Sequence, residues 1–84
     1  MKPLAAHIRS PSQLVNALKR YRKQSFLTQA ELGESAGLPQ TTVSKIEVEM
    51  IDPSLSTLFK VLAALDLEIE IKDRKSSVRA VTGK

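Results

Sequence analysis

The chain of 84 residues has no cysteine, no tryptophan, a single histidine and only three tyrosines and phenylalanines together. The lack of cysteine excludes disulfides and thiolate metal sites, and it fits a reducing cytosol. His7 alone does not make a metal cluster. So few aromatic rings argue against the stacking platforms that bind single-stranded nucleic acid. No apolar run approaches the ~18 residues of a membrane span, and the N-terminus lacks the apolar stretch of a secretory signal.

Catalytic patterns are also missing. We find no His/Asp/Ser constellation, no glycine-rich phosphate loop and no set of metal ligands, so we expect neither an enzyme nor a cofactor. The length allows one domain with a modest core, which association with a second copy would help to stabilise. The net charge of +4 and the pI of about 9.7 suit a polyanionic partner, although many unrelated proteins share this balance.

Short helical segments with clear start and stop signals make up most of the chain. Ser10, Pro11 and Gln13 form a helix start, and the apolar spacing that follows continues to about Gln24. A second helix starts with the capping box at Thr28 and stops before Gly37. The expected helices therefore cover about 11–24, 28–36, 40–47 and 53–65.

After the last helix the period changes. Residues 67–72 alternate strictly between apolar and charged, which predicts a half-buried strand over about 67–73. The segment 75–84 has no period, and we expect a flexible tail there after a domain at 1–74. The predicted class is mostly α with one C-terminal strand.

Segments 28–36 and 40–47, joined by a short turn that contains glycine, match a helix-turn-helix. At 100° per residue, one arc of the second segment carries Gln40, Thr41, Ser44 and Lys45. The opposite arc carries Thr42, Val43 and Ile46. The polar arc offers the groups that read base edges in a major groove, although an ordinary solvated face has the same composition.

Phosphate contacts have several candidates. Gln29, beside Thr28 at a helix start, can hold a phosphate together with free backbone N–H groups, or it can serve only as a capping residue. The other candidates, Arg20, Arg22 and Lys23, lie near the end of the first helix. Cations there also compensate the helix dipole, so both interpretations stay open.

These residues occur in the fixed register of the Cro/CI-type (Xre) helix-turn-helix family, which the chain resembles over about residues 11–66. The matching positions are Thr28, Gln29, Leu32, Gly37, Leu38, Gln40, Thr42, Val43, Ser44, Ile46 and Glu47. The resemblance implies a lambda-repressor-like domain of four to five helices. It also implies that Gln29 holds phosphate, that Gln40, Thr41 and Ser44 face bases, and that Arg22 and Glu47 form a structural salt bridge.

Residues 8–14 and the strand 67–72 are similar to those of HipB antitoxins. The resemblance implies a HipA-like serine/threonine kinase toxin as partner and repression of the shared operon. It also implies C-terminal strands that pair across a dimer. Pairing across a dimer is also expected on physical grounds, because a lone strand leaves its backbone groups without hydrogen-bond partners. Leu67, Ile69 and Ile71 would then cover the helices of a two-fold homodimer on a pseudo-palindromic operator.

Two other functions remain open. The first is that of a stand-alone Xre regulator, or of the antitoxin of another toxin type, with the same DNA-binding chemistry. A different class is a protein-interaction module without DNA binding, which the acidic segment 48–52 keeps in view. For the DNA-binding function we expect a bacterial cytoplasmic protein at the nucleoid.

Overall fold

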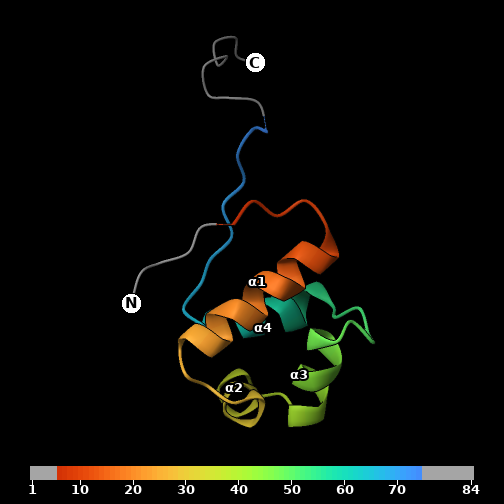
Figure 1. Ribbon diagram of the computed structural model, residues 1–84, viewed down its shortest axis with the longest axis vertical. Helices are drawn as coiled ribbons and strands as arrows, with labels where there is room; N and C mark the ends of the chain where they lie inside the picture. The colour runs from red at the N-terminus through yellow and green to blue at the C-terminus, as the bar shows by residue number, and fades with distance from the viewer. Residues whose placement is uncertain (1–5, 75–84) are drawn as a thin grey trace.

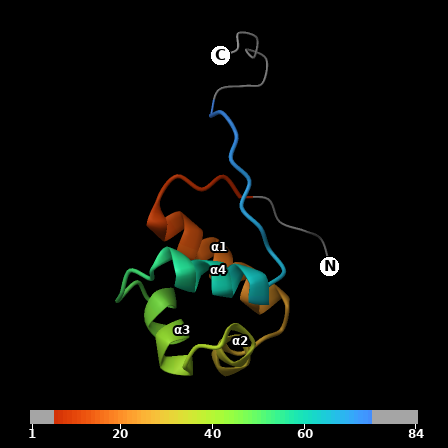
Figure 2. The same ribbon diagram turned by 180° about the vertical axis from the view of Figure 1, so that it is seen from behind.

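The computed structural model describes residues 6–74, and within that range the chain forms four helices. They are α1 (Pro11–Gln24), α2 (Gln29–Ala36), α3 (Gln40–Glu47) and α4 (Leu55–Ala64). Figure 1 shows α2 and α3 on one side of α1 and α4, while residues 67–74 run away on the other side. The view from behind in Figure 2 shows the same arrangement. The prediction of a mostly α helix-turn-helix domain is confirmed.

Helices α1 and α2 begin where their capping residues predict. Ser10 accepts a hydrogen bond from the Gln13 backbone N–H, and Pro11 occupies the first turn of α1. At α2 the Thr28 hydroxyl accepts from the Glu31 N–H, and the Glu31 carboxylate accepts from the Thr28 N–H. This reciprocal pair satisfies two backbone donors that a helix start leaves open.

A glycine allows the turn between α2 and α3 to close tightly. Gly37 ends α2 in a left-handed conformation with φ 73°, which costs glycine little. Gly33 lies under the same turn, and a Cβ atom placed there would be 2.6 Å from the Leu38 carbonyl oxygen. The Leu38 N–H in turn donates to the Gly33 carbonyl at 2.8 Å. The two helices therefore meet backbone against backbone.

The core lies where all four helices meet. Leu32 of α2 is its most buried side chain, with 1% of its surface exposed. The buried cluster consists of Leu18, Leu32, Val43, Val61, Leu62 and Leu65. Each helix contributes to this cluster, because its apolar residues recur at helical spacing on one face. None of the helices in residues 6–74 has the length and apolar character needed to cross a membrane.

Residues 67–72 do not form a strand in the described chain, which differs from the sequence prediction. Leu67 packs half-buried against the core, whereas Ile69 is 50% exposed and Ile71 is 93% exposed. A strand is defined by backbone hydrogen bonds to a neighbour, and no second strand is available within 6–74. The prediction of a flexible tail at 75–84 lies outside the described residues.

Candidate nucleic-acid interface

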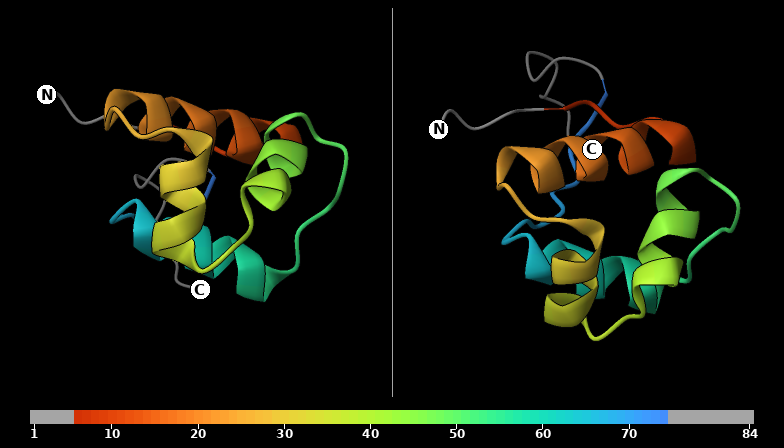
Figure 3. Two further views of the ribbon diagram at one scale, coloured as in Figure 1. Left: turned by 90° about the horizontal axis from the view of Figure 1, so that it is seen from below. Right: turned by 60° about the horizontal axis from the view of Figure 1, so that its bottom comes forward.

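One face of α3 is polar and open, as the sequence predicts. Gln40, Thr41 and Lys45 are exposed and Ser44 is half-buried. On the other face, Val43 and Ile46 are buried. The exposed face carries an amide, two hydroxyls and an ammonium group on two turns of helix. In Figure 3 the molecule is seen from the side on which α2 and α3 lie.

A chain of hydrogen bonds links this face to the interior. The Gln40 Nε2 donates to the Gln29 Oε1 over 3.5 Å, and the Gln29 Nε2 donates to the Glu47 Oε1 at 3.0 Å. The carboxylate therefore fixes which end of the Gln29 amide points at Gln40. The carbonyl oxygen of Gln40 and one of its amide hydrogens stay available, and this donor and acceptor pair is what an adenine edge requires.

Glu47 is held by a buried ion pair with Arg22 of α1. Arg22 Nε donates to Glu47 Oε2 at 2.6 Å, and Arg22 Nη2 donates to Glu47 Oε1 at 3.0 Å. The third guanidinium nitrogen, Nη1, donates to the Leu27 carbonyl at 2.7 Å. Both residues are 8% exposed. Three of the five N–H groups of Arg22 thus hold α3 and the α1–α2 turn onto α1.

The ionised form of Glu47 is favoured in this setting. Burial on its own raises the pKa of the carboxyl group. The hydrogen bonds from Arg22 and Gln29 outweigh burial, together with the charges of Arg22 and Lys19, so that the pKa lies below its ordinary value. Glu47 therefore remains an acceptor for both neighbours at neutral pH.

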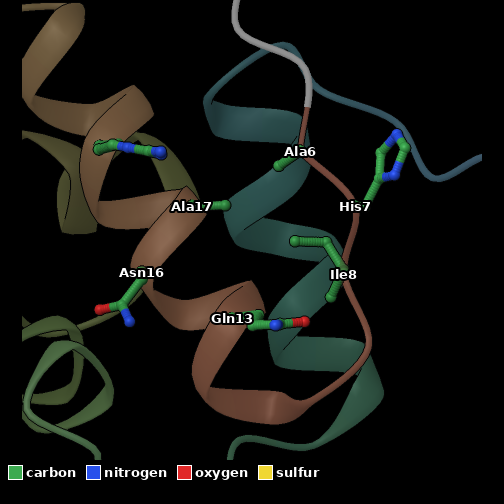
Figure 4. A pocket seen from close by; sticks show the side chains of 7 residues that line it. Ala6, His7, Ile8, Gln13, Asn16 and Ala17 are labelled. Atoms are coloured by element: carbon green, nitrogen blue, oxygen red, sulfur yellow. The ribbon is translucent and has the colours of Figure 1, made fainter.

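The cations of α1 have different environments. Arg22 is engaged in the interior, which leaves it poorly placed to reach a phosphate. Lys23 is exposed at the end of the helix, and half-buried Lys19 is near enough to lower the pKa of Glu47. Arg20 lines a hollow of about 310 Å³ between α1 and residues 6–8. Figure 4 shows the Gln13 side chain pointing toward residues 6–8, which lie along that side of α1.

The structure also has contacts that sequence reasoning missed. The Ser12 hydroxyl donates to the Glu49 Oε1 at 2.5 Å across 37 positions of sequence. Gln29 bonds to Glu47 across 18 positions. The local sequence does not predict either hydrogen bond, because both depend on how the helices pack against one another. Within 6–74, no group of three His, Cys, Asp or Glu residues is arranged to hold a metal ion.

Comparison with known proteins places this arrangement in a family. The profile of the helix-turn-helix family HTH_3 matches residues 18–72. Antitoxin HipB of Escherichia coli K12 is 40% identical over 70 residues, which cover 83% of this chain and 80% of that protein. Antitoxin HigA1 of Mycobacterium tuberculosis H37Rv is 39% identical over 69 residues, but they cover only 46% of that protein.

Two solved structures of high similarity extend the comparison. The HipB chain of a HipB–O4 20mer complex superposes with a TM-score of 0.78 at 39% identity, covering 84% of this chain and 100% of that one. A HipA–HipB–O2–O3 complex gives the same TM-score, identity and coverage. By domain match, by identity and by superposition, the chain belongs to the helix-turn-helix family HTH_3 and, within it, to the HipB antitoxins.

Proposed function

We propose that this chain is a dimeric, sequence-specific DNA-binding repressor and the antitoxin of a HipBA-type module. The observation that carries the proposal is the superposition on all of a HipB chain in complex with a 20mer, at 39% identity. The open polar face of α3 supports it independently. The site of action is then the chromosome, and for a bacterial protein this means the cytoplasm and the nucleoid.

In this proposal α3 enters the major groove and reads bases. Gln40 lies at its first residue, where base contacts concentrate. Thr41, Ser44 and Lys45 follow on the same face, and their hydroxyl and ammonium groups bond to base edges. The hydrogen bond from Gln40 to Gln29 limits the freedom of the Gln40 amide before DNA arrives, which lowers the entropic cost of the contact.

Phosphate contacts position the helix. Gln29 and Thr28 at the start of α2 bind one phosphate together with backbone N–H groups, where the positive end of the helix dipole attracts anions. Lys23, exposed at the end of α1, and Arg20, exposed on the same helix, supply cations for phosphate contacts. We assign Arg22 to the structural ion pair instead, because its guanidinium is buried.

A gel-shift or anisotropy series on the promoter upstream of the gene tests this assignment. Gln40→Ala should lose about 1–3 kcal/mol of discrimination at one base position. Lys23→Ala is the matched control, because it should weaken binding to all sequences alike and reduce the log–log salt slope by roughly 0.9. Loss of affinity in Gln40→Ala without any change in sequence preference contradicts the base-reading role.

We infer a homodimer through residues 67–72. Leu67, Ile69 and Ile71 alternate with charged residues, and an antiparallel copy of the same segment would pair their backbone and cover their apolar side chains. Such a dimer places two α3 helices about 34 Å apart on a pseudo-palindromic operator. Light scattering on a shortened chain that ends at Asp66 should give a monomer. A tight dimer of that chain contradicts strand pairing and points to the exposed Leu55 and Phe59 of α4.

The toxin partner is a HipA-like serine/threonine kinase. A HipB relative assembles with HipA and operator DNA in a solved complex, and this chain covers the whole of that HipB chain. Co-purification with the product of the adjacent gene tests the assignment. A stand-alone regulator would bind the promoter with the same affinity whether or not that product is present. A partner toxin would change the affinity or the size of the complex.

A further inference from the structure

The four helices end with the same backbone geometry but with different residues. After each helix one residue takes a left-handed conformation, and its N–H bonds to the carbonyl three residues earlier. The next N–H bonds five residues back, which is the Schellman motif. The left-handed residues are Phe26, Gly37, Glu49 and Asp66, with φ between 59° and 73°. Glycine adopts this conformation freely and aspartate more readily than most residues, whereas Phe26 and Glu49 are each strained by about 1 kcal/mol.

The side chain of Glu49 accounts for its presence in a position that favours glycine. Its Oε1 accepts a hydrogen bond from the Ser12 hydroxyl at 2.5 Å, in the first turn of α1. The turn that contains Glu49 also faces α1 across a hollow of about 320 Å³, lined on the α1 side by Pro11, Leu14 and Val15. Figures 1 and 3 show this turn beside the start of α1. A glycine at position 49 would relax the backbone and lose this link.

We propose that Ser12 and Glu49 form a clasp that fixes the orientation of α3 on α1, and so act as positioning residues for DNA recognition. This inference rests on the proposed function of α3. The buried pair of Glu47 with Arg22 is one tie between the end of α3 and α1, and the clasp is a second tie. Their anchor points on α1 are ten residues apart, about 15 Å along a helix. A single tie acts as a pivot, whereas two separated ties resist tilting of α3.

The clasp also restrains the negatively charged carboxylate of Glu49. The segment 48–52 carries two carboxylates directly after the base-reading helix, in a chain of net charge +4. A carboxylate free to approach DNA repels the phosphates. The hydrogen bond to Ser12 holds the Glu49 carboxylate at the start of α1. The same contact thus orients α3 and restrains an unfavourable charge.

The first arm of the test removes and restores the hydroxyl. The full chain is titrated with promoter DNA and with a scrambled duplex, and thermal unfolding is recorded for each protein. Ser12→Ala should lower the affinity for the promoter by about three- to tenfold and reduce its ratio to the scrambled duplex. That range is what one such hydrogen bond supplies. Ser12→Thr keeps a hydroxyl and should recover both values, and Glu49→Gln keeps an acceptor and should retain the preference.

The second arm separates positioning from stability. Glu49→Gly relieves left-handed strain of about 1 kcal/mol and loses a hydrogen bond of about the same size, so its melting temperature should change little while its promoter affinity falls. Asp66→Gly is the matched control: it also replaces a left-handed carboxylate residue by glycine, after α4, and should leave the promoter affinity unchanged. Promoter affinity then falls without a loss of stability only at position 49, which a merely structural contact does not produce.

Each outcome decides one proposal. If the wild-type chain binds the promoter specifically and both Ser12→Ala and Glu49→Gly bind as well or better, the clasp is wrong and Glu49 only repels DNA. If the wild-type chain has no preference for the promoter over the scrambled duplex, the proposed function itself fails, and the role of the clasp in recognition fails with it.

Discussion

Glu47→Gln should destabilise this protein far more than an ordinary surface substitution. The two carboxylate oxygens accept from two nitrogens of Arg22, and one of them also accepts from Gln29. In the isosteric amide one of these acceptors becomes an NH2 group, so whichever atom is replaced, a donor of Arg22 faces another donor. The guanidinium also keeps its charge in a site that is 8% exposed.

The expected loss is about 3 kcal/mol, at the lower end of what removing one partner of a buried ion pair costs, because the amide keeps one acceptor. A domain of this length has a total stability of about 4–12 kcal/mol, so the loss is a large part of it. Urea unfolding followed by circular dichroism measures the difference, with an unchanged m-value if only the folded state is affected. A loss below about 1 kcal/mol refutes the reasoning.

A double substitution and a pH series sharpen the same prediction. Arg22→Met combined with Glu47→Leu should be more stable than either single variant, because it leaves no unpaired buried charge. The pKa of Glu47 is held below its ordinary value of 4.5, so as the pH falls the unfolded chain takes up the proton first. The contribution of Glu47 is fully present above pH 4.5 and is lost as the pH falls further below it. Glu47→Gln should lack this part of the acid transition.

Three further substitutions have clear expected outcomes. Phe26→Gly should stabilise the protein by up to about 1 kcal/mol in urea unfolding, because Phe26 is left-handed and 88% exposed, and little packing is lost. Leu32→Ala should cost about 2–5 kcal/mol, because it opens a cavity at a side chain that is 1% exposed. Gly33→Ala should destabilise the protein and shift the amide NMR signals of the α2–α3 turn, although alanine favours a helix by about 1 kcal/mol. The new methyl group would be 2.6 Å from the Leu38 carbonyl oxygen, and a stabilised Gly33→Ala variant contradicts the close approach.

The local features of the fold could be predicted because they depend on neighbours in sequence. The Thr28 and Glu31 capping box, the glycine that ends α2 and the two faces of α3 follow from propensity and helical period. The pairing of Arg22 with Glu47 followed only from family resemblance. Gln29 was expected to hold a phosphate, and its bond to Glu47 had no signal in the sequence.

The features that could not be predicted depend on three-dimensional packing. The left-handed conformations of Phe26 and Glu49 could not be predicted from residue type, since glycine is the usual signal for that geometry. The bond from Ser12 to Glu49 requires the relative placement of two helices. The alternating segment 67–72 shows the opposite case, because its pattern is clear but no partner strand lies within residues 6–74.

The backbone contact between Gly33 and Leu38 has a consequence for the speed of operator search. Because the backbones of Gly33 and Leu38 are in direct contact, the angle between α2 and α3 is tightly restrained, and we expect it to change little when DNA binds. Association then does not wait for a conformational change, and it is governed by diffusion and by the attraction of a basic chain to phosphates. The association rate should therefore fall steeply with salt and depend little on the operator sequence. Differences between operators should appear in the residence time on each site.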